Sequence, residues 1–532
     1  MIFFHIAKLF EKGVWGRGRT SSPHTFTSGF STIEILIAFS VGIIFLSAAI
    51  MVVFSDPTLA RQISLESGQA AALDALLDSQ GLASSSNKFG ALMGSITENW
   101  SALIPTTDTS DSVDIYTYAS PEVTDISPCV KEVLGKTTWT SLRERQHQIS
   151  FGTALSNVNI AASYGRGACD PFPPGDWDNP EVTGWSVTPS SFTGTTTDMD
   201  VAILNGTSYV FISGKSDTTN EPDLMVIDIT NLEYPTVVAE VDFTPYGYNK
   251  IIVVDQTAYA LQNDTTNQIH ILDVSNPEYP TFVGAVTIPH TNTAVGRSLF
   301  YYDDSLYVGT QYLACPSSCA VTQNNEFHVY DVTARTSPIH IKSLNINHNI
   351  NDIMVSGTHA YLATSDNTGE LQIVDIRLPA TMVLPDDSGM KFDPSGNADG
   401  ISVYALGSYV YLGRARTTNS DSDLYKIDVS DSNIPIPTKW KKLGLGTNTK
   451  VLDIIVQSDV AFLITSDPSQ TFHVWDVKND NDTIISPIST CDNTLSHSKS
   501  VALAYYQSYI LVANEKDAKL DIIRDQPHVC TP

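Results

Sequence analysis

One five-residue pattern, an apolar strand that ends in aspartate, recurs along the C-terminal part of the chain. Its copies are Leu224–Asp228, Ile269–Asp273, Phe327–Asp331, Leu371–Asp375, Leu424–Asp428, Phe472–Asp476 and the degenerate Leu520–Arg524. A marker in the preceding strand recurs at intervals of about 50 residues, at Tyr209, Tyr259, Tyr307, Tyr361, Tyr411, Phe462 and Ile510. Short strands with this period predict a seven-bladed β-propeller, because one small sheet buries both faces only when neighbours stack on it.

The repeats resemble those of LVIVD-repeat proteins, down to the run DVSNPEYP at 273–280. The resemblance covers roughly residues 198–525 and implies a propeller over 198–532. We expect the repeated aspartates to cap the turns that follow them. A circular array must close on itself to protect its strand edges, so we expect a segment around 184–188 to supply the fourth strand of the last blade.

Near the N-terminus, the run from Ile35 to Phe54 contains twenty residues without a charge. At 1.5 Å of rise per residue, a helix of this length crosses about 30 Å of hydrocarbon. The residues before it include Lys8, Lys12 and Arg17. Positive charge on this side predicts that the N-terminal end stays in the cytoplasm.

The segment from Gly29 to Glu34, with the sequence GFSTIE, resembles the processing site of type IV pilins and pseudopilins. The resemblance implies cleavage after Gly29 by a prepilin peptidase and N-methylation of Phe30. It also implies that Glu34 pairs with the terminal amine of a neighbouring subunit, since a buried charge is tolerable once paired. The alternative is an uncleaved signal anchor in which Glu34 is an interfacial charge. A cleavable secretory signal fits less well, because no small-residue cleavage site follows the apolar run.

These patterns predict a multidomain, mainly β fold class with a pilin-like N-terminal part. The expected regions are a leader peptide over 1–29, a long pilin-like helix over 30–80 that is transmembrane at 35–54, a small α+β pilin-like head over 81–170, a linker and closing strand over 171–197, and the propeller over 198–532.

Charge and cysteine content restrict the partners and the compartment. The formal net charge of −28 argues against a nucleic-acid partner. All six cysteines follow the apolar run, on the exported side, where disulfides form. Chain order favours three local pairs: Cys129 with Cys169, Cys315 with Cys319, and Cys491 with Cys530, the last stapling the seventh blade. A zinc site at Cys315 and Cys319 is the weaker interpretation, because no second ligand pair lies close in sequence.

The repeat register places one residue from each innermost strand at one mouth of the central channel. These binding candidates are Asp200, Lys250, Ser298, Asp352, Ser402 and Asp453, with Val501 in the seventh blade. Converging acids and a lysine can hold a cation or a polar ligand, and propellers commonly bind ligands in this place. The alternative is a hydrated mouth without a ligand.

Catalytic motifs are not evident, and we expect no enzymatic activity and no cofactor. The histidines have no serine, cysteine or carboxylate at an informative spacing, and no phosphate loop or metalloprotease pattern occurs. The acidic runs 421–423 and 480–482 are candidate calcium sites. These runs lack the glycine and distal glutamate of an EF-hand loop, so solvated turns are the better interpretation.

The predicted function is that of a bacterial type IV pilin-like filament subunit, minor or at the tip, that displays a propeller for adhesion or ligand binding. The precursor would lie in the cytoplasmic membrane and the product in an extracellular filament. Its partners would be prepilin peptidase, other pilin subunits through the N-terminal helix, and an unknown ligand on a host or neighbouring cell. The alternatives are a pseudopilin-like component of a secretion system, and a membrane-anchored propeller with hydrolase or receptor activity.

Overall fold

The computed structural model of the chain places one three-stranded sheet and seven four-stranded sheets. The described residues all belong to one compact unit, 65–532. They are 116–128, 130–140, 146–156, 177, 180–183, 185–192, 194–215, 221–289, 294–313, 325–382, 390–417, 422–441, 443, 446–467, 471–477, 486–491, 499–516 and 518–525.

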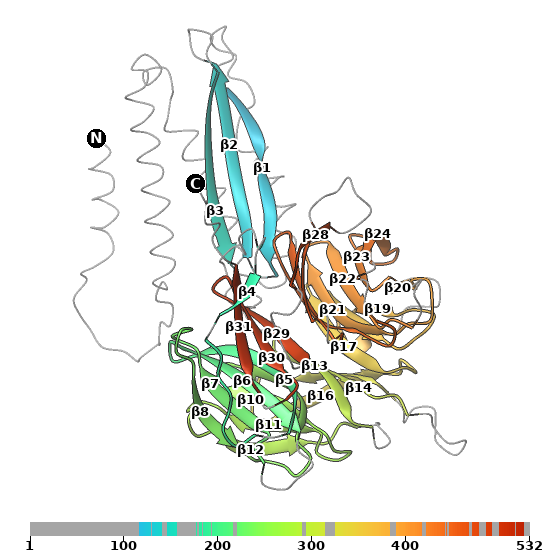
Figure 1. Ribbon diagram of the computed structural model, residues 1–532. Helices are drawn as coiled ribbons and strands as arrows, with labels where there is room; N and C mark the ends of the chain where they lie inside the picture. The colour runs from blue at the N-terminus through green and yellow to red at the C-terminus, as the bar shows by residue number, and fades with distance from the viewer. Residues whose placement is uncertain are drawn as a thin grey trace, which may run out of the picture. The chain divides into compact units, whose positions relative to one another are not determined.

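The seven four-stranded sheets are the blades of the predicted propeller (Figure 1). In each blade the strands are given from the innermost outwards. The first blade consists of β5 (Thr195–Leu204), β6 (Thr207–Lys215), β7 (Leu224–Asp228) and β8 (Thr236–Val241), and the second of β9 (Tyr248–Val254), β10 (Thr257–Gln262), β11 (Ile269–Asp273) and β12 (Thr281–Val286). The third blade consists of β13 (Gly296–Tyr302), β14 (Ser305–Thr310), β15 (Phe327–Asp331) and β16 (Ile339–Leu344).

The remaining four blades follow the same antiparallel order. The fourth blade consists of β17 (Ile350–Ser356), β18 (His359–Thr364), β19 (Leu371–Asp375) and β20 (Lys391–Phe392), with the 3-10 turn η3 (Pro379–Thr381) before β20, and the fifth of β21 (Gly400–Leu406), β22 (Tyr409–Arg414), β23 (Leu424–Asp428) and β24 (Ile436–Lys441). The sixth blade consists of β25 (Val451–Gln457), β26 (Val460–Thr465), β27 (Phe472–Asp476) and β28 (Ser486–Cys491). The seventh consists of β29 (Ser500–Tyr506), β30 (Tyr509–Asn514), β31 (Leu520–Asp525) and β4 (Pro180–Val182).

The hydrophobic core lies between the blades. Each innermost strand contacts the next one around the ring, and β29 contacts β5, which closes the circle. The apolar residues of the third strands are buried in every blade, for example throughout Leu224–Ile227 in β7. A third strand is covered on both faces, by the blades on either side. Its residues are therefore mostly apolar, which explains why this pattern is the clearest repeat in the sequence.

The repeated aspartates cap turns, as predicted. The Oδ1 atom of Asp228 accepts a hydrogen bond from the backbone N–H of Thr230 at 2.8 Å. The same bond joins Asp273 to Ser275, Asp331 to Thr333, Asp375 to Arg377 and Asp428 to Ser430. These side chains therefore turn the chain from the third strand to the fourth.

The last blade is closed by a segment from the other end of the propeller sequence. The strand β4 pairs antiparallel with β31, and Val187 makes an isolated bridge with Leu520. The main part of the closing strand thus lies a few residues before the expected 184–188. Ahead of it, the fully buried Trp177 packs edge-on against Phe462, with 4.8 Å between the ring centroids.

The predicted fold class, with its long transmembrane N-terminal helix and α+β head, is wrong. Strands, turns and the short η3 make up the described residues, which contain no α-helix. Within 81–170, the described residues form an antiparallel sheet of β1 (Tyr116–Ser127), β2 (Val130–Thr140) and β3 (Gln146–Ser156). Valine, isoleucine and threonine are frequent in these strands, and β-branched residues favour pleated structure.

A membrane-spanning helix is likewise not found in the described part of the chain, where no helical segment has the necessary length and apolarity. The leader 1–29 and the expected helix over 30–80, including the run 35–54, lie outside the described residues.

The cysteine predictions fall outside the described side chains, which include none of the six cysteines. The backbone of Cys491 ends β28, a strand of the sixth blade, whereas the fourth strand of the seventh blade is β4. The three disulfides, including the Cys491–Cys530 staple of the seventh blade, stay predictions.

Candidate functional site

The innermost strands are edge strands of their sheets, so their backbone groups on the channel side need acceptors and donors from elsewhere. Side chains of the preceding blade supply them. In β17, Asp352 Oδ1 accepts the N–H of Ile353 at 3.0 Å, and Asp352 Oδ2 accepts the N–H of Val403 in β21 at 2.9 Å. One carboxylate thus ties two neighbouring blades at the channel.

Three further aspartates make the same bond between blades, with N···O distances from 2.7 to 3.2 Å. The acceptor and donor residues are Asp198 with Ile251, Asp200 with Val253, and Asp453 with Leu503. Asp198, Asp200 and Asp453 are buried. Buried carboxylates are tolerated when they accept hydrogen bonds, so these residues contribute to blade cohesion.

The other predicted mouth residues also join adjacent blades. The hydroxyl of Ser298 donates to the carbonyl of Ile350 at 3.3 Å, and that of Ser402 donates to the carbonyl of Val451 at 3.0 Å. Lys250 Nζ lies 3.1 Å from Oδ1 of Asp198, a residue of the first blade. The structure therefore brings all six predicted residues to the innermost strands, in positions that connect blades.

The register of the first blade differs from the predicted one. The strands β5 and β6 contain ten and nine residues, against seven and six in β9 and β10. Counting from the hairpin turn selects Asp200, whereas the bond to the next blade shows that Asp198 is the equivalent of Asp352. Asp200 lies two residues further along β5.

The predicted register of the seventh blade also differs from the observed one, by one residue. Leu511 pairs with Ile522 as Phe462 pairs with Val474 in the sixth blade. Ala502, and not Val501, is therefore the seventh member of the ring. It carries no polar group, so the ring of side-chain ties is interrupted in this blade.

A small cavity lies on the propeller axis between the innermost strands. Its lining combines four carboxylates with apolar side chains: Asp198, Asp200, Asp352 and Asp453 with Ile251, Ile252, Leu299, Phe300, Ile353, Met354, Val403, Tyr404, Ile454 and Ile455. Among the described residues, no three His, Cys, Asp or Glu side chains form a group that could hold a metal ion. Each of these carboxylates already accepts backbone N–H groups, which occupies part of its capacity to accept hydrogen bonds from a polar ligand.

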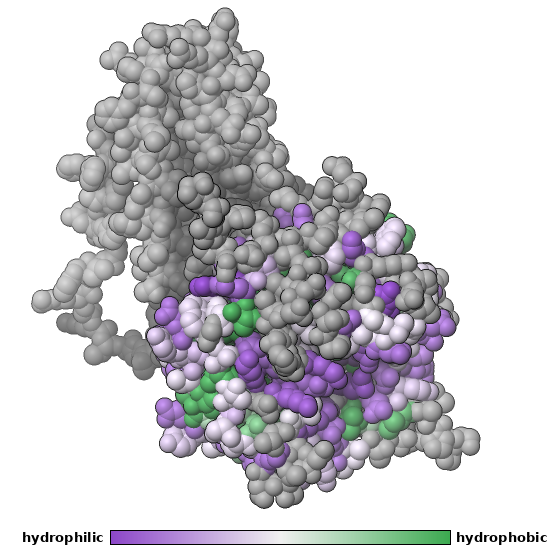
Figure 2. Space-filling view, viewed as in Figure 1, coloured by the Kyte–Doolittle hydropathy of each residue, from purple (hydrophilic) through white to green (hydrophobic). Residues whose placement is uncertain are grey.

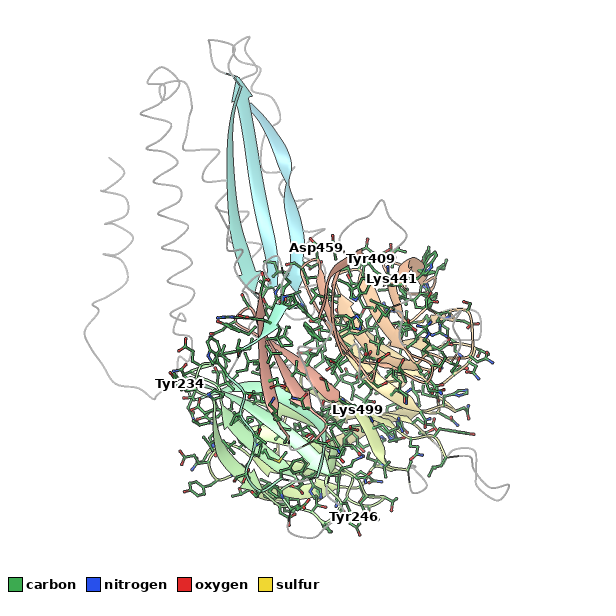
Figure 3. All side chains as sticks on the ribbon, viewed as in Figure 1. Tyr234, Tyr246, Tyr409, Lys441, Asp459 and Lys499 are labelled. Atoms are coloured by element: carbon green, nitrogen blue, oxygen red, sulfur yellow. The ribbon has the colours of Figure 1, made fainter. Side chains whose placement is uncertain are left out.

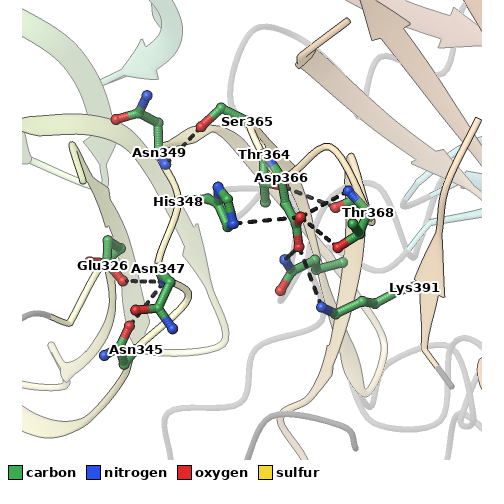
Figure 4. A network of polar contacts seen from close by, with 12 residues as sticks. Glu326, Asn345, Asn347, His348, Asn349, Thr364, Ser365, Asp366, Thr368 and Lys391 are labelled. Carbon is green, nitrogen blue, oxygen red and sulfur yellow. Dashed lines mark hydrogen bonds and ion pairs between the residues drawn. The ribbon is translucent and has the colours of Figure 1, made fainter. Parts of the chain in front are cut away.

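A second set of polar side chains, which the sequence patterns did not reveal, stands just before the third strands. Glu326 Oε2 accepts the N–H groups of Ile346 and Asn347 at 2.7 and 2.9 Å (Figure 4). Burial raises the pKa of Glu326 to about 7, although these hydrogen bonds oppose the shift. Asp223 and Gln268 hold the corresponding loops of the first two blades. The signal in the sequence is an acid or amide directly before the repeat.

A more exposed network surrounds Asp366 (Figure 4). Its carboxylate accepts the N–H and hydroxyl of Thr368 at 2.9 and 2.7 Å, and it lies 3.5 Å from His348 Nε2 and 3.4 Å from Lys391 Nζ. Burial opposes ionisation, yet the bonds from Thr368 and the nearby His348 and Lys391 hold the pKa of Asp366 below its ordinary value. The network positions loops of the third and fourth blades.

Comparison with known families agrees with the repeat. Residues 258–288 and 349–386, in the second and fourth blades, match the LVIVD repeat. These segments do not include Gly29, Phe30 or Glu34, which also lie outside the described residues. A search of curated proteins finds no match.

The solved structures to which this chain is similar include the following three. The computationally designed Ika8 protein is 10% identical with a TM-score of 0.43, over 63% of this chain and 98% of that one. A chain of the Mitotic Checkpoint Complex is 13% identical with a TM-score of 0.46, over 65% and 92%. BamB from Moraxella catarrhalis is 10% identical with a TM-score of 0.39, over 66% and 98%. The described part of this chain is a seven-bladed β-propeller that contains LVIVD repeats.

Proposed function

We propose that the propeller is a binding module that recognises another protein through one of its two faces. In each antiparallel blade, the turn between the first and second strands and the turn between the third and fourth strands lie at the same end. We call this end of the propeller the turn face. The exposed large apolar side chains in or beside these turns are Ile203, Tyr234, Tyr279, Leu378 and Ile434, each at least 62% exposed.

These exposed side chains are the observation that carries the proposal. They come from four different blades, so they are distributed around the turn face and do not arise from one irregular loop. Ile339 and Ile436, at the starts of fourth strands, extend the set. The surface visible in Figure 2 is largely hydrophilic, with hydrophobic residues in separate places. Single exposed apolar side chains are common on protein surfaces, and it is their recurrence at the same end of four blades that favours an interaction surface here.

The channel mouth supports a ligand less well. Its carboxylates accept backbone N–H groups of the neighbouring blade, so part of their capacity to bind a ligand already serves to hold the propeller together. Binding at Asp200, Lys250, Asp352 or Asp453 stays a prediction. We also propose a binding role in preference to catalysis, because a rigid ring of tied blades suits the presentation of a surface.

A more specific proposal is that the propeller is displayed on a filament, and this proposal rests on the sequence alone. The GFSTIE segment at 29–34 supports processing after Gly29 and export of the chain. Mass spectrometry of the N-terminus tests it. A start at methylated Phe30 is expected, and retention of residues 1–29 would contradict it.

Photo-crosslinking tests the binding role of the turn face. A photoreactive phenylalanine analogue replaces Leu378 or Ile434 in the full-length protein expressed in cells. The matched control is Tyr246, which is 48% exposed but lies in the loop between two blades, at the opposite end of the propeller. Figure 3 shows Tyr246 well separated from Tyr234 of the turn face. We expect crosslinks to a second polypeptide from Leu378 and Ile434 and not from Tyr246. Equal crosslinking from all three positions, or from none, would overturn the proposal.

A further inference from the structure

Two neighbouring blades present the same short sequence on the turn face. The first blade has Glu-Tyr-Pro at 233–235 and the second has Glu-Tyr-Pro at 278–280. The corresponding positions of the fifth blade, Asn433 and Ile434, have no acid and no aromatic ring. Glu233, Tyr234, Glu278 and Tyr279 are exposed, with the tyrosines at 73% and 70%.

The two turns are built alike and are held firmly. The N–H of Tyr234 donates to the carbonyl of Asn231 at 3.0 Å, and the N–H of Glu233 donates to the Asn231 side chain at 3.1 Å. Asn276 makes both bonds in the second blade, at 3.0 and 3.3 Å. Proline after each tyrosine restricts the backbone further. A ring and a carboxylate in such a turn are presented with little loss of entropy on binding.

The fold does not require these side chains. An aromatic ring that stays 70% exposed buries too little area to add much to stability. The turn itself is formed by Asn276 and by Asp273, which caps it through the N–H of Ser275. A hydrogen bond of 3.3 Å from the side chain of Asn205, in the turn between β5 and β6 of the first blade, to the carbonyl of Ser275 holds the Glu-Tyr turn of the second blade. The paired tyrosines are therefore available to a partner.

The adjacent third blade shows which chemical group such side chains hold. On the same turn face, the guanidinium of Arg335 lies 5.1 Å from the ring centroid of Tyr301. It also lies 2.7 Å from the carboxylate of Asp304 and 3.1 Å from that of Asp255. Arginine combines a flat face that stacks on an aromatic ring with donors that pair with carboxylates. Within this chain, a tyrosine ring and neighbouring carboxylates thus bind an arginine side chain.

We propose that the Glu-Tyr turns of the first two blades recognise arginine side chains in an extended segment of the partner protein. The net charge of −28 favours a basic partner and would accelerate its association. Each turn carries one exposed tyrosine and, next to it in the sequence, one exposed glutamate, so we expect two arginines to bind, one on each blade. The inference rests on the proposed protein-binding role and specifies the chemistry of the partner.

Calorimetric titration of the full-length protein with synthetic peptides tests this inference. The probe is a peptide of alternating arginine and glycine, and the control is the lysine and glycine peptide of equal charge, both at physiological ionic strength to screen non-specific attraction. We expect the arginine peptide to bind at least about fivefold more tightly than the lysine peptide, because lysine stacks less well. We expect Tyr234→Ala with Tyr279→Ala to remove this difference.

The matched control is Leu378→Ala with Ile434→Ala, which removes equally exposed side chains from other blades of the turn face. This variant should keep the preference for arginine. Equal affinity of the two peptides, or an unchanged preference in the double tyrosine variant, would overturn the inference. A lost preference in the control variant would do the same. Crosslinking from Leu378 and Ile434 is independent of these titrations. Retained crosslinks with no arginine preference would refute the arginine recognition and leave the proposed function standing.

Discussion

Arg414 and Glu370 form an ion pair in which both side chains are completely buried, with 3.0 Å between Nη2 and Oε1. The guanidinium also donates to the carbonyls of Ala398 and Ser395. A buried charge of this kind is tolerated only while its partners are present. The pair joins the fourth blade to the fifth, so it contributes directly to blade cohesion.

Replacing Arg414 with methionine should destabilise the protein by about 3–5 kcal/mol, because Glu370 is then left as an uncompensated buried acid. The midpoint of urea unfolding measures the loss. Arg377→Met is the control, since Arg377 pairs with Asp375 on the surface. An exposed pair contributes at most about 1 kcal/mol. Equal midpoints for the two variants would show that the buried pair is not a structural tie.

Asp453→Ala should cost about 2–3 kcal/mol, because the N–H groups of Ile454 and Leu503 both lose their acceptor. Asp453→Asn should cost less, since one amide oxygen can still accept one of these bonds. Thermal unfolding followed by circular dichroism checks both variants. Wild-type stability of Asp453→Ala would contradict the role of the carboxylate as a tie between blades.

The stability of the propeller should fall as the pH rises from about 5 to about 8. Burial raises the pKa of Asp223 to about 8 and that of Glu326 to about 7, while in the unfolded chain both titrate near 4. The folded state therefore holds more protons in this range. The stabilisation is complete below the unfolded pKa and is lost as the pH passes through the folded pKa.

Glu326→Gln should make this pH dependence shallower, because an amide oxygen accepts the same N–H groups without titrating. The second blade has Gln268 at the corresponding position, where its Oε1 accepts the N–H of Ile288 at 2.9 Å. Urea unfolding at several pH values measures the slope. A stability that increases between pH 5 and 8, or a slope that Glu326→Gln leaves unchanged, would refute the assignment.

Trp177→Ala should loosen the closure of the ring. Trp177 is fully buried against Phe462, and its backbone N–H donates to Asp525 in β31 at 3.1 Å. Loss of a buried tryptophan costs about 3–5 kcal/mol. Hydrogen exchange should become faster in β31 and β4 before it does so in the second blade. Trp440→Ala is the control, because this side chain is 41% exposed. Equally fast hydrogen exchange in all blades of both variants would argue against a local role of Trp177 in the closure by β31 and β4.

Local sequence patterns were sufficient to predict those features that depend on the burial or hydrogen bonding of a short segment. The third strands are mostly apolar because blades cover them on both faces, and each following aspartate caps its own turn within two residues. Such features repeat at intervals of about 50 residues, so the number of blades could be counted in the sequence. The expected α+β head failed because short apolar segments do not distinguish a helix from a strand by periodicity alone.

The amino-acid sequence alone determined the seven repeats, the propeller and the need for a closing segment, because these follow from burial and from the period of the chain. Only the tertiary structure showed that Asp198 and not Asp200 is equivalent to Asp352, since an extended hairpin shifts the register without changing the pattern. It also showed that the mouth carboxylates bind backbone N–H groups of the next blade, and that Tyr234 and Tyr279 lie exposed on one face. Contacts between residues about fifty positions apart depend on how blades pack, which local patterns do not encode.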